Sequence, residues 1–205
     1  ELTFNLTDGA VFQKSNENII LNSYLTEMAL LGKDLETKYL KENLDATTIT
    51  SIFEKQKNLQ KSYEEKSEGT LVQYFIKANQ PYIPNEFETA ANYIKNATTN
   101  YFTNIQFNDE VLQSSNFLIE KSLAYITGIE TEGMSKEQSL NKNVDKVAAQ
   151  TRSLDLNFQK YFMGMLWENL VSYNLITTAN YLAERYLIPI ANQLNDTILV
   201  LKLTQ

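Results

Sequence analysis

Apolar residues recur every three or four positions through most of the chain, which is the spacing of one face of an α-helix. The first stripe predicts a helix over about residues 16–40, which Ser15 or Asn16 can cap. Its members are Leu21, Tyr24, Met28, Leu31 and Leu35. A turn at residues 43–45 precedes a second stripe, formed by Ile49, Ile52, Gln56, Leu59 and Tyr63. The two stripes predict an antiparallel helical hairpin.

The hairpin should have a narrow apolar seam, similar to that of a coiled coil. We expect it to form from Leu21, Met28, Leu31 and Leu35 facing Ile52, Leu59 and Tyr63. The opposite faces carry Lys33, Lys38, Lys55 and Lys61 and should stay in water. We therefore expect an arm that projects from the body or lies on a partner surface, where it mediates contacts between domains or subunits.

Pro81 and Pro84 mark the expected boundary of this hairpin, because each proline disfavours α geometry in the residue before it. We predict a strand or linker from a preceding β domain at residues 1–14, a hairpin subdomain at 15–80 and a helical bundle at 81–205. Residues 2–6 alternate apolar and polar, as a strand does. Ser135 and Gln138 form a capping box at the start of one bundle helix. The predicted fold class is all-α, with a short N-terminal strand.

The net charge argues against nucleic acid as a partner, and the lack of a long apolar run argues against a membrane-spanning helix. The chain has 18 Lys and Arg against 25 Asp and Glu, a net charge of −7. An acidic surface repels phosphate, so nucleic acid is not an expected partner. No apolar run approaches the length of about 18–20 residues that a membrane-spanning helix needs.

The complete lack of Cys and His removes many kinds of chemistry. It excludes disulfides, thiol redox reactions and Cys/His zinc sites within this chain. It also excludes the Ser-His-Asp triad and its Cys-His variants. We therefore predict no catalytic, cofactor-binding or metal-binding residue, and no enzymatic activity for this chain.

Two motifs have a catalytic interpretation that their context disfavours. Ser139 and Lys142 match the Ser-x-x-Lys nucleophile motif, but its usual partner motifs do not occur in the chain. Glu64, Glu65 and Glu68 form an acidic cluster, yet lysines flank them on one helix end, which indicates surface ion pairs. We expect a solvated helix face in both cases.

Aromatic residues are concentrated in the C-terminal third, and one interpretation of them is an aromatic groove for sugar or peptide. They are Tyr161, Phe162, Trp167, Tyr173, Tyr181 and Tyr186. Their helical spacing favours core packing. Asn5, Asn96 and Asn195 begin glycosylation sequons, which arise by chance in an Asn-rich chain.

Several short segments resemble a known family. Residues 12–18 (Phe-Gln-Lys-Ser-Asn-Glu-Asn), the Tyr82-Ile83-Pro84 run and residues 101–110 (Tyr-Phe-Thr-Asn-Ile-Gln-Phe-Asn-Asp-Glu) are similar to the helical region of Bacteroidetes-type TlpA-like thioredoxin proteins. Residues 181–186 (Tyr-Leu-Ala-Glu-Arg-Tyr) resemble its closing helix, although Met163-Gly164-Met165 lies earlier than in the family and lacks a following Asp. The resemblance implies a periplasmic or cell-envelope protein in which a Cys-x-x-Cys thioredoxin domain follows this region.

Three functions remain open from the sequence. The first is a non-catalytic helical module of an envelope thioredoxin-like protein, acting in spacing, oligomerisation or substrate selection. Its partner would be a protein: its own thioredoxin-like domain, another subunit or a client. The second is a stand-alone helical protein that binds a peptide or glycan. The third, an enzyme that uses only carboxylates and tyrosines, has the least support.

Overall fold

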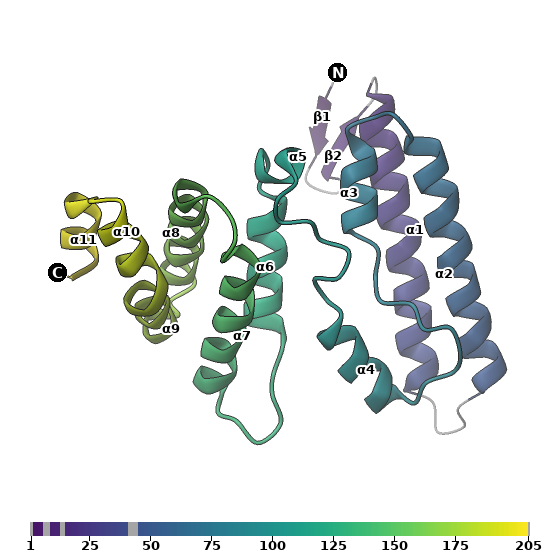
Figure 1. Cartoon of the computed structure of the whole chain (residues 1–205). Helices are drawn as coiled ribbons and strands as arrows, with labels where there is room; N and C mark the ends of the chain where they lie inside the picture. The colour runs from purple at the N-terminus through teal and green to yellow at the C-terminus, as the bar shows by residue number, and fades with distance from the viewer. Residues whose placement is uncertain (1, 6–8, 13–14, 41–44, 205) are drawn as a thin grey trace. The chain divides into compact units, whose positions relative to one another are not determined.

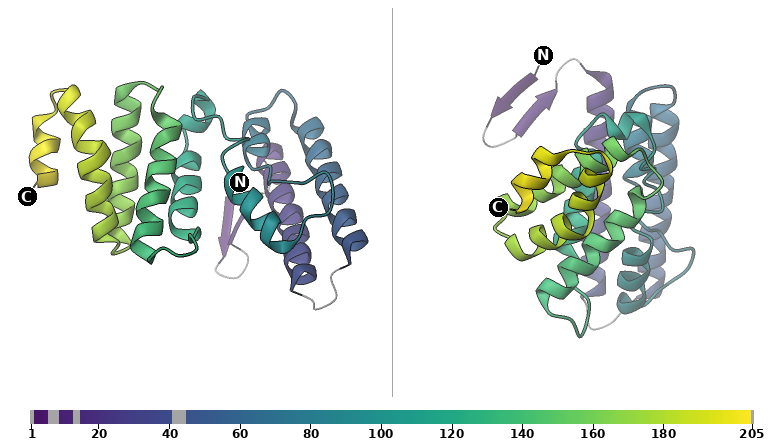
Figure 2. Two further views of the ribbon diagram at one scale, coloured as in Figure 1. Left: turned by 60° about the horizontal axis from the view of Figure 1, so that its bottom comes forward. Right: turned by 60° about the vertical axis from the view of Figure 1, so that its left-hand side comes forward.

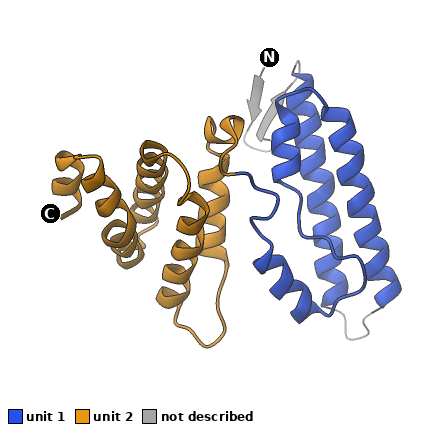
Figure 3. Ribbon diagram, in the orientation of Figure 1, with its two compact units in different colours: residues 1–106 blue, residues 107–205 orange. Residues whose placement is uncertain are grey.

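The computed structural model describes residues 2–5, 9–12, 15–40 and 45–204, and these are predominantly helical (Figure 1). The chain begins with a two-stranded antiparallel hairpin, β1 (Leu2–Asn5) and β2 (Gly9–Phe12), in which Leu2 lies opposite Phe12. The sequence analysis expected a single strand here. The chain divides into two compact units, residues 1–106 and 107–205 (Figure 3).

Unit 1 is built on two long helices that run in opposite directions (Figure 1). Its helices are α1 (Asn16–Tyr39), α2 (Ala46–Ser67), α3 (Val72–Ala78) and α4 (Ala90–Thr99). Ser15 and Asp45 cap α1 and α2, because each side-chain oxygen accepts a backbone N–H of the first turn. The turn expected at residues 43–45 falls mostly outside the described residues.

Two apolar clusters hold unit 1 together, and both extend beyond the α1–α2 seam. The first contains Tyr24, Met28 and Tyr63 from the two long helices together with Val72 and Ile76 from α3. The second contains Leu35, Ile49, Ile52 and Phe53, and it is covered by Ile83, Phe87 and Tyr93. The α1–α2 pair is therefore the core of unit 1 and differs from the projecting arm that the sequence predicted.

A partly buried polar network explains why unit 1 does not end at Pro81. The Tyr39 hydroxyl donates to the Glu88 backbone oxygen at 3.0 Å. The Tyr82 hydroxyl and the Asn96 amide both donate to Glu88 Oε1, at 2.7 and 2.8 Å. These bonds fasten the segment after Pro81 and the helix α4 onto α1. The boundary between the compact units therefore lies after Gln106 and not at the prolines.

Unit 2 consists of short and medium helices. They are α5 (Glu110–Gln113), α6 (Phe117–Gly128), α7 (Lys136–Thr151), α8 (Leu156–Ser172), α9 (Ile176–Leu182), a π-helical turn η1 (Ala183–Leu187), α10 (Ile188–Gln193) and α11 (Thr197–Thr204). The expected capping box is present at the start of α7, where Ser135 and Gln138 exchange hydrogen bonds with each other's backbone. These helices confirm the helical bundle that the sequence predicted.

An aliphatic core fills unit 2, where α7 and α8 each pack against both α6 and α9 (Figure 2). Its fully buried members include Ile126, Val147, Leu166, Leu170 and Leu182. Burying one such side chain contributes about 1.5–3 kcal/mol to folding. The buried Asn143 of α7 donates to the carbonyls of Ile126 and Ile129, at 3.1 and 2.7 Å, and thereby satisfies the C-terminal end of α6.

A π-helical turn interrupts the helix that runs from α9 to α10. Pro189 lies just after it, and proline has no N–H to donate to the carbonyl four residues earlier. The helix widens at this point, so that the Ile188 N–H bonds to Ala183 O, five residues back. Among the helices of the described residues, none is both long enough and apolar enough to cross a bilayer.

Candidate functional site

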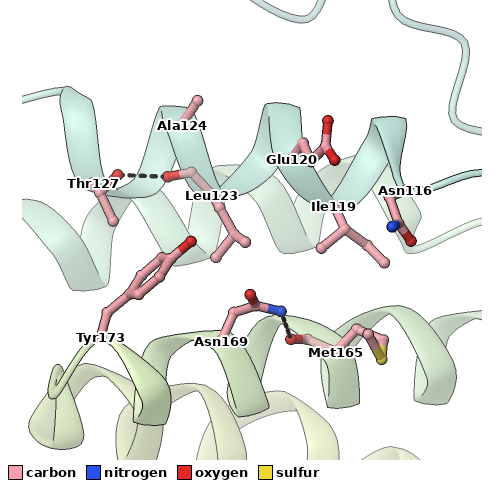
Figure 4. Close-up of a pocket in the computed structure, with 9 residues that line it drawn as sticks. All are labelled: Asn116, Ile119, Glu120, Leu123, Ala124, Thr127, Met165, Asn169 and Tyr173. Atoms are coloured by element: carbon pink, nitrogen blue, oxygen red, sulfur yellow. Dashed lines mark hydrogen bonds between the residues drawn. The ribbon is translucent and has the colours of Figure 1, made fainter. Parts of the chain in front are cut away.

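Unit 2 has a groove between α6 and α8, with a volume of about 540 Å³ (Figure 4). We call it the α6–α8 groove. Its floor is apolar: Ile119 and Leu123 of α6 and Met165 of α8 project into the space between the helices. This volume lies within the range of about 300–1,000 Å³ that is typical of ligand sites.

Helical periodicity explains the walls of the groove. Residues four positions apart lie on one face of a helix, so each helix presents a row of side chains. The row on α6 consists of Asn116, Glu120, Ala124 and Thr127, and the row on α8 consists of Met165, Asn169 and Tyr173. The two helices run in the same direction, with Thr127 and Tyr173 at one end of the groove (Figure 4).

The polar groups of the groove lie at its edges. Asn169 Nδ2 donates to the Met165 carbonyl at 2.8 Å, which fixes the amide and leaves its oxygen as an acceptor. Glu120 and Asn116 are exposed at the rim of α6. Tyr173 closes one end with a ring that is 55% exposed. An apolar floor with amides and one carboxylate at the rim can hold an apolar side chain and pair with polar groups beside it.

The solvated helix face expected for Ser139 and Lys142 is wrong for Ser139, which is buried, whereas Lys142 is exposed. The Ser139 side chain is 2% exposed, and its Oγ accepts the Thr131 backbone N–H at 3.1 Å. Lys142 Nζ lies 3.4 Å from Thr131 Oγ1. Both side chains therefore hold the loop before α7 in place. Gly133 shapes this loop, since its φ of 77° lies in the left-handed region that favours glycine.

The acidic cluster of α2 lies along one helix. Glu64 accepts a hydrogen bond from the buried amide of Gln60 at 2.7 Å. Glu65 forms an i,i+4 ion pair with Lys61 at 4.0 Å, which is the surface pairing expected from the sequence. Glu68 is the residue that ends α2.

The aromatic residues of the C-terminal third do not form one groove. Phe162 is buried in the core, where it stacks on Phe158 with 5.8 Å between the ring centroids. Lys202 Nζ lies 5.3 Å from the ring centroid of Trp167. Tyr161 is exposed, Tyr173 lines the α6–α8 groove, and only Tyr181 and Tyr186 converge, on Asp145.

The sequon residues have different environments. The Asn96 amide bonds to Glu88 Oε1 and is partly buried. Asn195 is exposed and has a φ of 56°. The side chain of Asn5 lies outside the described residues.

Metal-ligating side chains do not cluster in the part of the chain that the structure describes: no three His, Cys, Asp or Glu residues come together there in a group that could hold an ion. The fold and the groove define a predominantly helical protein with a concave surface of ligand-sized volume. The chain matches no protein-family model, no curated protein and no solved structure at a significant level.

Proposed function

We propose that this chain is a non-catalytic helical module that binds a segment of a polypeptide in the α6–α8 groove. The observation that carries the proposal is the groove itself, with its apolar floor and polar rim. In protein surfaces, such a floor accepts the apolar anchor residue of a partner, and polar groups at the rim set its orientation.

The dimensions of the groove suit a short peptide. The row from Asn116 to Thr127 covers about 16 Å at a rise of about 1.5 Å per residue. An extended segment of about five residues has the same length. The oxygen of Asn169 and the amide of Asn116 can pair with the backbone of such a segment. Met165 adds an adaptable surface, because its side chain is flexible and polarisable.

The resemblance to TlpA-like proteins supports a place for this module in a larger envelope protein. In this proposal a thioredoxin-like domain follows the chain, and the groove binds that domain, a second subunit or a client protein. The long helices α1 and α2 serve as the spacing element, since α1 alone extends about 36 Å. The reading frame after Gln205 tests this context: a Cys-x-x-Cys motif about 40–60 residues on supports it. An immediate stop codon instead favours a stand-alone binding protein.

Peptide selection tests the groove directly. A library of random 12-residue peptides is selected on the whole chain, and the selected peptides are then measured on the Ala124→Trp variant. Ala124 is exposed on the groove wall, so the indole fills the groove without entering the core. Ala149→Trp is the matched control, because Ala149 is also exposed and lies on α7 outside the groove.

The expected result is a set of peptides that share one or two large apolar residues and bind the wild-type chain and Ala149→Trp equally. Ala124→Trp should bind them at least about tenfold more weakly, as expected when an anchor residue loses its pocket. Peptides that bind both Trp variants alike, or no enrichment at all, would show that the groove does not hold a polypeptide.

A further inference from the structure

A second concave surface of unit 2 lies beside α7 and has a different chemistry from the α6–α8 groove. It has a volume of about 520 Å³ and is lined mainly by polar side chains. We call it the Asp145 pocket. The residues that matter for the argument are Met134, Asn141, Lys142, Asp145 and Tyr181. None of them belongs to the α6–α8 groove.

A network of hydrogen bonds fixes one wall of the Asp145 pocket. The hydroxyls of Tyr181 and Tyr186 both donate to Asp145 Oδ1, at 2.8 and 2.6 Å. Arg185 Nε lies 3.3 Å from the same oxygen. The π-helical turn η1 contains Arg185 and Tyr186, and such turns are frequent at functional sites. All three contacts use Oδ1, and no described residue donates to Oδ2.

Asn141 provides a polar group that the fold leaves unused. Its Oδ1 is buried and accepts no hydrogen bond from any described residue. Buried polar atoms are almost always paired, so an unpaired one on a residue that lines a pocket points to a missing partner. The Asn141 side chain donates no hydrogen bond within the described residues either. Its amide can therefore rotate into the Asp145 pocket without breaking a bond.

The ligand must match both acceptors and donors. Asp145 Oδ2 and Asn141 Oδ1 accept hydrogen bonds, whereas the Lys142 ammonium carries three donors and makes one long contact of 3.4 Å. Asp145 and Lys142 line the pocket with opposite charges, so an anion is repelled by the first and a cation by the second. A purely apolar ligand leaves all of these polar groups unpaired, which is costly.

A neutral polyhydroxyl ligand satisfies these conditions. Each hydroxyl both donates and accepts a hydrogen bond, so adjacent hydroxyls can pair with Asp145, Asn141 and Lys142. The C–H face of a sugar ring can pack on Tyr181 and Met134, which also line the pocket. We propose that the Asp145 pocket binds a saccharide, either as a free sugar or as the terminal residue of a glycan.

Titration of the full chain, labelled with ¹⁵N, tests this site. The probes are the methyl glycosides of glucose, galactose and mannose and N-acetylglucosamine, with a matching oligosaccharide to separate a free sugar from a glycan end. At least one probe should produce saturable shifts in the amides of residues 133–145 and of Tyr181. Asn141→Ala and Lys142→Ala should each weaken binding by about fivefold to tenfold, which is the effect of one lost hydrogen bond.

Matched controls keep this site separate from the groove. Asn157→Ala and Lys146→Ala remove an exposed Asn and an exposed Lys outside the pocket and should leave binding unchanged. Ala124→Trp should also leave the saccharide shifts unchanged, and Asn141→Ala should leave peptide binding unchanged. The proposal is overturned if no probe gives saturable shifts at these amides. It is equally overturned if Asn141→Ala and Lys142→Ala bind as tightly as the two controls.

Discussion

Units 1 and 2 are nearly equal in length, yet they are stabilised in different ways. Among the described residues, unit 2 contains about twice as many buried hydrophobic side chains as unit 1. Unit 1 relies more on tyrosines whose hydroxyls bond to side chains far along the chain, as Tyr24 does to Gln60 and Tyr63 to Glu27. Contacts between aliphatic side chains have no preferred direction. Hydrogen bonds do, so the bonds of Tyr24 and Tyr63 fix the register of α1 against α2. Both concave sites described above lie in unit 2.

The largest expected effect comes from the aliphatic core of unit 2. Leu166 is 0% exposed, so Leu166→Ala should lower the free energy of unfolding by about 3 kcal/mol through lost burial and a residual cavity. Urea denaturation followed by circular dichroism measures this change. Leu201→Ala is the control, because Leu201 is 60% exposed and its loss should change stability by less than about 0.5 kcal/mol. Equal effects of both variants would contradict the packing described for unit 2.

A smaller effect is expected from a single hydroxyl of unit 1. Tyr24→Phe removes the donor that lies 2.7 Å from Gln60 Oε1 and leaves this buried oxygen without that bond. The free energy of unfolding should fall by about 1–2 kcal/mol. Tyr74→Phe tests the specificity of the effect, since Tyr74 is exposed and makes no hydrogen bond through its hydroxyl within the described residues. A neutral Tyr24→Phe variant would show that the seam does not depend on this bond.

The smallest effect is a difference in pH dependence. Burial, the negative charge of Glu88 and the neighbouring tyrosines raise the pKa of Tyr39 to about 12, from an ordinary value of about 10. The unfolded chain therefore releases this proton at a lower pH than the folded chain does. Stability contributed by the protonated Tyr39 is complete below pH about 10 and is lost as the pH rises towards about 12.

Denaturation midpoints at several pH values within this window measure the loss. The decline with pH should be shallower in Tyr39→Phe than in the wild type, because phenylalanine has no proton to release. An identical decline in Tyr39→Phe would assign the alkaline instability to other groups.

Local sequence patterns predicted much of the helical structure. The stripe of Leu21, Met28 and Leu35 and the Ser135–Gln138 capping box depend on residues close together in the chain, and the structure has a helix at each place. The α6–α8 groove could not be predicted in this way. Its two walls are rows on helices that only tertiary packing brings together, and each row alone resembles an ordinary surface.

The extent of unit 1 and the Asp145 pocket depend on contacts between distant residues. Pro81 and Pro84 correctly indicate a break in helical structure, but the hydrogen bonds of Tyr82 and Asn96 to Glu88 keep the following segment in unit 1. Pro189 is the one sequence feature that points to the Asp145 pocket. A proline inside a helical pattern indicates a distorted turn, and this turn contains Arg185 and Tyr186, which contact Asp145.

Titration of the ¹⁵N-labelled chain with a peptide selected on it tests the central proposal most directly. The account predicts saturable shifts that concentrate on α6 and α8 around Leu123 and Asn169, and in Ala124→Trp the same shifts should need at least about tenfold more peptide. Shifts concentrated in unit 1, or shifts on α6 and α8 that saturate at the same peptide concentration in Ala124→Trp as in the wild type, would contradict the proposal that this chain binds a polypeptide through the α6–α8 groove.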